Sequence, residues 1–478
     1  MKKRDIALLI SGLATIALVY RSWSLRTTSQ SKILEASKEP FPFATTEALS
    51  MARYPPEGRD TFKINELVSL CHYGVDWTID KKSVLVSASN MSIKAQKLAY
   101  LGDCRPLEFV IHQDGRSMGH CSDFAQYILH ADARLSPEFD EQTYKRKLKL
   151  CPRTTYLHFE RARSFFFSNS STHRNWWVPN IEQISKLEVG FFPRTSKFLC
   201  KSRIACTTIQ KYLNATNLLR SQKNSEDVYD NASDLEYSHT AGQRLVYVSH
   251  SSTDVVDDGN QVLGAKRVSR LKQDFSQFLH IHGTSGRKHT RELYNCWKEH
   301  PEWPKLTIIG NKDKQEYETD PPTEGPMPEN IQVFTRLRIE QLRELQLSIG
   351  IHICPSSQEG YGHYINEARS LGALVLTTNH PPMNEFVVDA VSGILLNHDT
   401  PSPEEYQLLA PYFVSPVHVE PKHICDAVAR VLKEYDVEKR REMGRRARLA
   451  FEYDTYVMKT NMAQLKDEAY SYFNGESE

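Results

Sequence analysis

The sequence predicts an α/β protein with two domains, each built on a parallel sheet that helices cover on both faces. Its 478 residues are more than one compact core usually organises, which favours two domains with additional segments. Hydrophobic residues make up 40% and charged residues 25% of the chain, which is ordinary for a globular protein. Short continuous apolar runs alternate with helical stretches, the pattern of strands buried on both faces.

The first half of the chain contains strand-like runs between polar or helical stretches. These runs are 84–89, 107–112, 155–160, 197–201 and 245–250. Their apolar residues are continuous rather than alternating, which indicates a parallel sheet. Residues 217–244 are polar and carry no periodicity, so we predict a flexible insertion there.

The alternation becomes more regular in the second half. Strands are predicted at 278–281, 306–309, 331–334, 349–353, 373–377 and 393–396. Helices are predicted at 290–300, 339–347, 364–371 and 422–435, and a last helical stretch covers 438–473. This order of elements is typical of a doubly wound α/β domain.

The segment 354–387 contains the residues best suited to chemistry. It reads CPSSQEGYGHYINEARSLGALVLTTNHPPMNEFV: a buried strand ends, a loop with Gly360 and Gly362 follows, and a helix begins. Ligands of doubly wound sheets lie at the C-terminal ends of strands, and free amides at a helix N-terminus favour a phosphate. Glu359 and Glu367 frame this loop, and a carboxylate can accept two hydrogen bonds from a vicinal diol. As isolated residues, Glu359 would be a turn residue and Glu367 an acid on a helix surface. Together with the glycine loop, the helix and the following strand, they indicate a nucleotide-sugar site.

This segment resembles the E-x7-E signature of GT-B glycosyltransferases, especially the large retaining family 4. The matching residues are Pro355, Ser356, Glu359, Gly360, Gly362, Glu367, Ala368, Gly372 and Glu385. The resemblance covers about 278–460 and implies the GT-B fold, in which two doubly wound Rossmann-like domains face each other across a cleft. It also implies that Glu367 contacts the nucleotide ribose and that Glu359 contacts the transferred sugar.

The resemblance further implies the reaction. We expect transfer of a hexose-type sugar from a UDP- or GDP-linked donor to a hydroxyl of a glycan or lipid, with retention of configuration. The nucleotide sugar is a substrate, so no cofactor is expected. Further residues expected to bind substrate come from the glycine loop and from the later loop 382–385: Gly360, Tyr361, Gly362, His363, Asn384 and Glu385.

A second segment, 283–290, also resembles the family. It reads GTSGRKHT and follows a predicted strand, where family members place an Arg and a Lys for the donor diphosphate. Lys288 matches the Lys, Thr284 stands at the usual Arg or Lys position, and Arg287 is our candidate for the missing charge. We assign Lys288 and Arg287, with Glu359, to catalysis because the departing diphosphate develops negative charge. Gly283 is predicted to bind substrate; a solvated basic turn is the alternative reading of the segment.

The first half resembles the family only weakly, and we identify neither its acceptor loop nor a catalytic residue there. Segments 177–182 (WVPNIE) and 200–203 (CKSR) are predicted to line the cleft, and 250–254 to lie at the interdomain hinge. Core packing or turn chemistry explains each equally well. The sequence contains no D-x-D, the motif that holds Mn²⁺ or Mg²⁺ in glycosyltransferases of the other fold, so no metal is expected.

The N-terminus predicts a membrane anchor. Residues 2–4 are basic, and the uncharged run 6–20 ends at Arg21. This run is short for a spanning helix, which needs roughly 20 residues, but extension to residue 25 and a thin ER or Golgi bilayer would suit it. A cleaved signal peptide is the competitor, although no clear A-x-A site follows. We therefore expect a single-pass type II protein whose catalytic part lies in the ER or Golgi lumen.

The expected organisation follows from these features. It comprises a cytosolic tail at 1–5, the anchor at 6–25, a Pro-punctuated stem at 26–65, an acceptor domain at 66–265, a nucleotide-sugar domain at 266–437 and C-terminal helices at 438–478. Four sequons are compatible with a lumenal glycoprotein, at Asn90, Asn169, Asn214 and Asn231.

Cysteine usage and net charge limit the partners. The nine cysteines lack metal-binding spacing, so zinc is not expected. One or two disulfides among Cys71, Cys104, Cys121 and Cys151 are an open possibility beside buried free thiols. A net charge of +1 without a basic stripe argues against nucleic-acid binding.

Other functions compete with the glycosyltransferase reading. The motif GRSMG at 115–119 follows a predicted strand and precedes a helix, as a nucleophile elbow does, so Ser117 would serve an α/β-hydrolase. The dipeptide Asp114-Gly115 is also a strong turn signal, and a hydrolase leaves the segment 359–385 unexplained. A nucleotide-sugar epimerase and a non-catalytic protein with the same fold are the remaining alternatives.

Overall fold

The computed structural model describes residues 101–110, 123, 126–128, 130–135, 141–160, 174–182, 184, 186–223, 244–283, 285–310, 327–334, 337–402 and 414–476. All of them belong to one compact unit, Phe62–Glu478. The predicted tail, anchor, stem and strand at 84–89 lie outside these ranges. Within the ranges, no helix combines the length and apolar character that crossing a membrane requires.

The first sheet is parallel throughout and has six strands in the order β2-β1-β3-β4-β5-β6. The strands are β1 (Leu107–Val110), β2 (Arg134–Leu135), β3 (Thr155–Glu160), β4 (Arg174–Pro179), β5 (Lys197–Cys200) and β6 (Leu245–Tyr247). Its helices are α6 (Glu141–Leu150), the 3₁₀ segment η2 (Lys186–Arg194) and α7 (Arg203–Lys223). The predicted strands at 155–160, 197–201 and 245–250 are confirmed to within a few residues.

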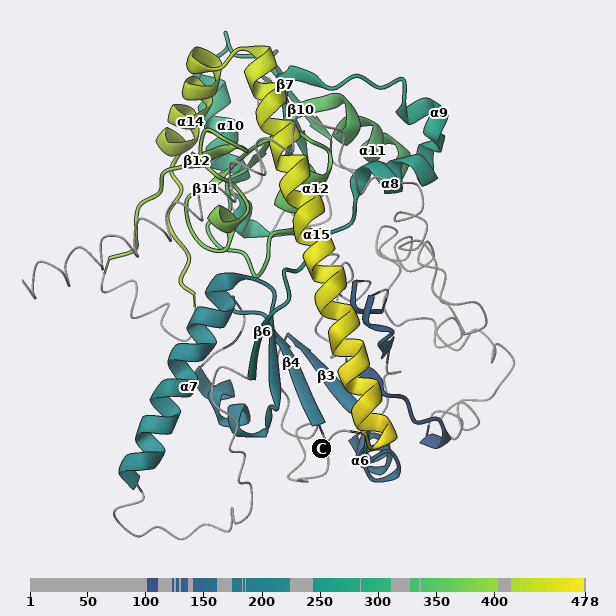
Figure 1. Cartoon of the computed structure of the whole chain (residues 1–478). Coiled ribbons are helices and arrows are strands. Elements are labelled where there is room, and N and C mark those ends of the chain that lie inside the picture. Colours follow the sequence, from purple (N-terminus) through teal and green to yellow (C-terminus); the bar gives the residue numbers. More distant parts are fainter. Residues whose placement is uncertain are drawn as a thin grey trace, which may run out of the picture. The chain divides into compact units, whose positions relative to one another are not determined.

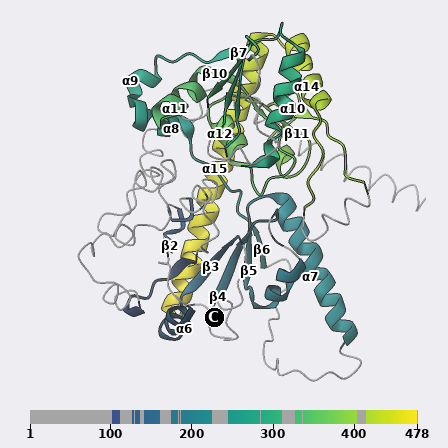
Figure 2. The ribbon, with the colours of Figure 1, turned by 180° about the vertical axis from the view of Figure 1, so that it is seen from behind.

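Side chains of this sheet alternate between two buried layers, as the pleat of a strand requires. Trp176 packs with Leu157 and Leu199 in one layer, whereas the next residue, Trp177, packs with Phe198 in the other. The first layer is closed by the C-terminal helix and the second by α7. Figure 2 shows α7 beside β5 and β6.

The second sheet is also parallel and has six strands in the order β12-β11-β10-β7-β8-β9. The strands are β7 (Asp274–Ile281), β8 (Leu306–Ile309), β9 (Ile331–Phe334), β10 (Ile349–Cys354), β11 (Leu374–Thr378) and β12 (Ile394–Leu396). Counted from β7, this is the dinucleotide-fold order 3-2-1-4-5-6, in which the chain changes direction between the first and fourth strands. Here those strands are the neighbours β7 and β10.

Helices cover both faces of the second sheet. They are α8 (Val255–Gly259), the π segment η4 (Asn260–Gly264), α9 (Ala265–Val268), α10 (Thr290–Glu299), α11 (Ile339–Ser348), α12 (His363–Ser370) and α14 (Pro421–Glu434), with 3₁₀ turns η5 (Gly286–Lys288) and η6 (Met383–Glu385). Phe278 packs against α10 and α14, and the next residue, Leu279, packs on the α11 side. The two buried faces confirm a doubly wound domain.

The last helix, α15 (Val437–Asn474), joins the two cores. Met443 near its start is buried with the second sheet, whereas Met458, Met462 and Leu465 are buried with the first. Figure 1 shows it running along both sheets. The predicted C-terminal helices are thus one helix over the described residues.

Three disulfides lie among the described cysteines. Cys104–Cys151 is one of the pairings that the sequence left open, while Cys71 and Cys121 lie outside the described residues. Cys200–Cys206 links β5 to α7, and Cys296–Cys425 links α10 to α14. Cys354 is a buried free thiol.

Some predicted elements were wrong. Residues 217–223 continue helix α7 rather than starting a flexible insertion. No strand was predicted at β4, whose run is closed by Pro179 and whose tryptophans carry no clear period. The two-residue β2 and the short helices α8 and α9 were not predicted.

Candidate active site

The loops that follow β7 and β10 meet at the point where the strand order of the second sheet reverses. The loop after β7 begins with Gly283, whose φ is +65°, and continues into η5 with Arg287 and Lys288. The loop after β10 contains Glu359. Because ligands of doubly wound sheets bind in the crevice at such a reversal, the topology brings the two predicted segments to the same place.

Contacts between these loops confirm that Lys288 and Glu359 lie together. The Lys288 ammonium is 3.5 Å from Glu359 Oε1 and 3.0 Å from the centre of the Tyr364 ring. Ser356 Oγ donates to the same Glu359 oxygen at 2.6 Å and contacts the Tyr364 hydroxyl. The Ser357 amide donates to Arg287 O at 2.9 Å, which fixes one loop on the other.

Glu367 lies near the same strand end. It is partly exposed on α12. Burial raises the pKa of the Cys354 thiol; Lys288 opposes the rise, and the charges of Glu359 and Glu367 add to it. All three charged groups therefore lie close enough to act on the last residue of β10.

Two buried histidines at the end of β7 contact the start of α10 and so hold the loop between them in place. His280 Nε2 lies 2.8 Å from Thr290 Oγ1, and His282 Nδ1 lies 2.5 Å from the same hydroxyl. His280 Nδ1 also lies 2.9 Å from Ile353 O in β10. Burial lowers the pKa of His280 to about 3, so it stays neutral and holds α10 and its preceding basic turn against the sheet.

The glycine loop packs against the first domain. A Cβ at Gly360 would lie 2.0 Å from Asn180 Oδ1, so only glycine fits this approach. Gly362 has φ +99° at the start of α12, a conformation that glycine tolerates. The buried Tyr361 donates its hydroxyl to His250 O. The loop is thus held by the chain that joins the two domains.

Polar residues of the first domain gather at one edge of its sheet. Glu160 ends β3, Asn180 follows β4, Lys201 follows β5 and His250 lies after β6. Parallel strands bring their carboxyl ends to the same edge. Glu160 and Ser249 have positive φ values of 66° and 52°, and such strained residues concentrate at functional sites.

A buried charge cluster occupies this edge. Lys201 Nζ lies 2.8 Å from Asp123 Oδ2 and 3.4 Å from Glu160 Oε1. Burial acts to raise the pKa of Asp123, but Lys201, His363 and His250 outweigh it and hold that pKa well below its usual range. Burial likewise opposes the charge of Lys201, yet Asp123 and Glu160 raise its pKa to about 12. The cluster therefore contains a stable ammonium and a stable carboxylate.

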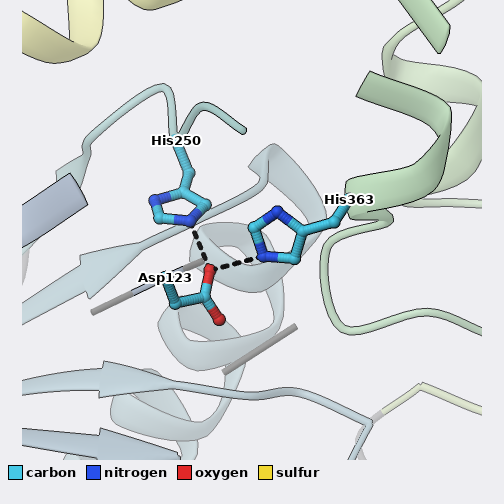
Figure 3. Close-up of side chains that lie close together, drawn as sticks. All are labelled: Asp123, His250 and His363. Atoms are coloured by element: carbon cyan, nitrogen blue, oxygen red, sulfur yellow. Dashed lines mark hydrogen bonds and ion pairs between the residues drawn. The ribbon is translucent and has the colours of Figure 1, made fainter. Parts of the chain in front are cut away.

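Two histidines reach the other oxygen of Asp123 from different elements (Figure 3). His363 Nε2 on α12 lies 2.9 Å from Asp123 Oδ1, and His250 Nε2 contacts the same atom. His363 Nδ1 lies 2.8 Å from Ser252 Oγ. The three ligand-type atoms lie within 4.8 Å of one another, as metal ligands do. However, the Lys201 ammonium already pairs with the other oxygen of the Asp123 carboxylate. A divalent ion bound to Asp123 would therefore be repelled by this ammonium.

Further contacts join the two domains. Arg287 Nη1 donates to Glu182 Oε2 at 3.0 Å. Glu385 accepts from the amides of Arg203 and Ile204, at 2.6 and 2.8 Å, at the start of α7. Asn384 donates to Asn379 Oδ1 at 3.1 Å. The structure thus groups Lys288, Arg287, Glu359 and the glycine loop, whereas Glu385 contacts the start of α7 and Asn384 contacts Asn379 within its own domain.

Asp123 and Glu160 of the charge cluster were not singled out from the sequence, and Lys201 was named only as part of the segment 200–203. The segments 177–182 and 200–203 were predicted to line the cleft. They contain Asn180, Glu182 and Lys201, which take part in the contacts described above, and the cleft lining itself stays a prediction. A signal existed, because the strands predicted at 155–160, 197–201 and 245–250 end at Glu160, Lys201 and His250. Ser117 and the rest of GRSMG lie outside the described residues.

Comparison with known proteins finds one family model that matches part of the chain. Residues 265–408 match the model of the family described as glycosyl transferases group 1. This match includes Lys288, Glu359 and Glu367 and supports a glycosyltransferase. No curated protein matches the chain.

Three solved structures illustrate what the course of the chain is similar to. HepE from Anabaena, in complex with UDP and glucose, has 12% identity and a TM-score of 0.40, over 71% of this chain and 77% of that chain. A glycosyltransferase from Rickettsia africae has 10% identity and a TM-score of 0.46, over 71% and 85%. The pneumococcal O-GlcNAc transferase GtfA, in complex with UDP and GlcNAc, has 13% identity and a TM-score of 0.42, over 69% and 59%.

Proposed function

We propose that the chain is a GT-B glycosyltransferase of the E-x7-E type. It moves a hexose-type sugar from a UDP- or GDP-linked donor to a hydroxyl of a glycan or lipid, with retention of configuration. The observation that carries this proposal is the meeting of Lys288 and Glu359, 3.5 Å apart, at the strand-order reversal of the segment that matches the family.

Each charged group has a chemical role in this proposal. Lys288 and Arg287 stabilise the diphosphate as it departs, because they place positive charge where negative charge develops. Glu359 binds the hydroxyls of the transferred sugar, and Glu367 binds the ribose. Gly283, Gly360, Tyr361, Gly362 and His363 shape the donor site, while Asn384 and Glu385 remain predictions.

The acceptor binds at the edge of the first sheet, where Asp123 and Glu160 lie. With Lys201 supplying the positive charge there and Lys288 and Arg287 serving the diphosphate, the reaction needs no metal. The three disulfides among the described cysteines favour an oxidising compartment. In this proposal the compartment is the ER or Golgi lumen, where an N-terminal anchor of the type II kind holds the catalytic part.

Calorimetry with UDP and GDP on the purified full chain tests the donor site. Glu367→Ala should weaken nucleotide binding about tenfold, as the loss of one charge-assisted hydrogen bond does. Lys288→Ala should slow transfer about 10²-fold, more than it weakens binding, because its charge acts most in the transition state. The exposed Glu299 and Lys305 provide matched controls, whose alanine variants should keep wild-type affinity.

Undiminished UDP and GDP affinity in Glu367→Ala would contradict the ribose assignment. Nucleotide binding without sugar transfer to any hydroxyl acceptor would instead favour the non-catalytic alternative.

A further inference from the structure

Glu182 is a rigidly held carboxylate that contacts a cation of the proposed donor site. It follows β4 in the first domain, and its Oε2 accepts from Arg287 Nη1 at 3.0 Å. Asn180 donates to its Oε1 at 3.2 Å and accepts from its backbone amide at 3.4 Å. Asn180 is itself fixed, because it donates to Glu160 at 2.7 Å and lies against Gly360.

The two partners differ in their surroundings. The Glu182 side chain is 18% exposed, whereas that of Arg287 is 42% exposed. Arg287 is therefore free to change partners, while Glu182 is held in place. Burial raises the pKa of Glu182, the charges of Glu359 and Glu160 raise it further, and Arg287 opposes that rise.

We propose that Glu182 is a positioning residue that competes with the donor diphosphate for Arg287. This inference rests on the proposed function, in which Arg287 serves the diphosphate. When the diphosphate takes Arg287, Glu182 loses its cation and faces a second anion, with Glu359 close by. Donor binding is thus an exchange of partners at Arg287, and Glu182 lowers donor affinity until the exchange occurs.

The proposal predicts a gain in affinity upon removal of a polar contact. Glu182→Gln should bind UDP about three- to tenfold more tightly by calorimetry, because a partly exposed ion pair and a like-charge repulsion are both removed. Arg287→Ala should bind UDP more weakly. The double variant should show no gain over Arg287→Ala, since the cycle isolates the coupling between the two residues.

A control separates this competition from a general loosening of the domains. Glu468→Gln weakens another contact, between α15 and the first domain at Arg174 and Lys197, without touching Arg287, so it should not tighten UDP binding. If Glu182→Gln folds poorly by thermal unfolding, Glu182→Asp, which keeps the charge but shortens the reach to Arg287, should still give part of the gain.

The outcomes are distinct. Unchanged or weaker UDP binding in Glu182→Gln, an equal gain in the Arg287→Ala background, or a similar gain in Glu468→Gln would each overturn the competition while leaving the donor site standing. A wild-type chain that binds neither UDP nor GDP would overturn the proposed function, and this inference with it.

Discussion

Replacement of Lys201 by methionine should be among the most destabilising single changes in the first domain. The Lys201 side chain is 3% exposed and that of Asp123 is 2% exposed, and their charged atoms lie 2.8 Å apart. At that distance and an effective dielectric constant of about 20, their attraction is on the order of 6 kcal/mol before desolvation is subtracted. Lys201→Met keeps the volume but leaves Asp123 and Glu160 buried without their cation, which costs about 3–5 kcal/mol.

Urea unfolding followed by tryptophan fluorescence measures this loss, because Trp176 and Trp177 are buried in the same sheet. Only the transition that reports on this domain is compared, since a chain with two cores need not unfold in one step. Lys422→Met is the matched control: Lys422 pairs with Asp399, but both are more than half exposed, so the change should destabilise the protein far less than Lys201→Met does.

A loss below about 1 kcal/mol in Lys201→Met, or one equal to that of Lys422→Met, would refute the claim that Lys201 neutralises a buried acidic pair. The double variant with Asp123→Asn should recover part of the loss, because it removes the charge left without a partner.

Two further predictions follow from the packing of the site. Gly360→Ala should lower the kcat/KM of sugar transfer by about 10²-fold, because the new Cβ would lie 2.0 Å from Asn180 Oδ1 and must displace the donor loop. Gly310→Ala is the control, because the nearest neighbour of its added Cβ lies at 3.9 Å. Full activity in Gly360→Ala would contradict the close approach. Acidification should destabilise the second domain, because burial lowers the pKa of His280 to about 3 and the unfolded chain takes up its proton first. The stabilisation that comes from keeping His280 neutral is complete above about pH 6.5 and is lost as the pH falls toward 3. At pH 5 the loss is about 2 kcal/mol. Unfolding curves at pH 5 and above about pH 6.5 measure this loss of stability. A His280→Asn variant that keeps the full pH dependence would count against the role of His280.

The second domain was predictable because its signals are local. Continuous apolar runs gave strands β8 and β9 at their observed bounds. The glycine loop and the carboxylates around it lie within a few residues of β10, so sequence spacing alone placed Glu359 beside a helix start. Even the pairing with Lys288 followed from one topological rule, since β7 and β10 are neighbours in this strand order.

The first domain was harder because its site is assembled across long sequence separations. Asp123, Glu160 and Lys201 come from three different connections, and their charges meet only after the sheet has formed. No local feature of the sequence distinguishes Glu160 from any other acidic residue at a strand end. Its place in the charge cluster depends on contacts with Asn180 and Lys201. The sequence does show a polar residue at the end of several predicted strands. This recurrence becomes informative only when the strand order is known.

If the proposed function holds, the charge pairs at Arg287 and Lys288 imply an order of events in donor binding. Arg287 and Lys288 are each held by an acid, at 3.0 Å by Glu182 and at 3.5 Å by Glu359. A diphosphate that takes both cations releases both acids. Glu359 then has free lone pairs at the position where the sugar lies in our proposal, so diphosphate binding prepares the carboxylate that holds the sugar. A free sugar without its nucleotide would have to break the Lys288 contact by itself. We therefore expect the sugar to bind weakly alone, and the nucleotide diphosphate to supply most of the donor's affinity.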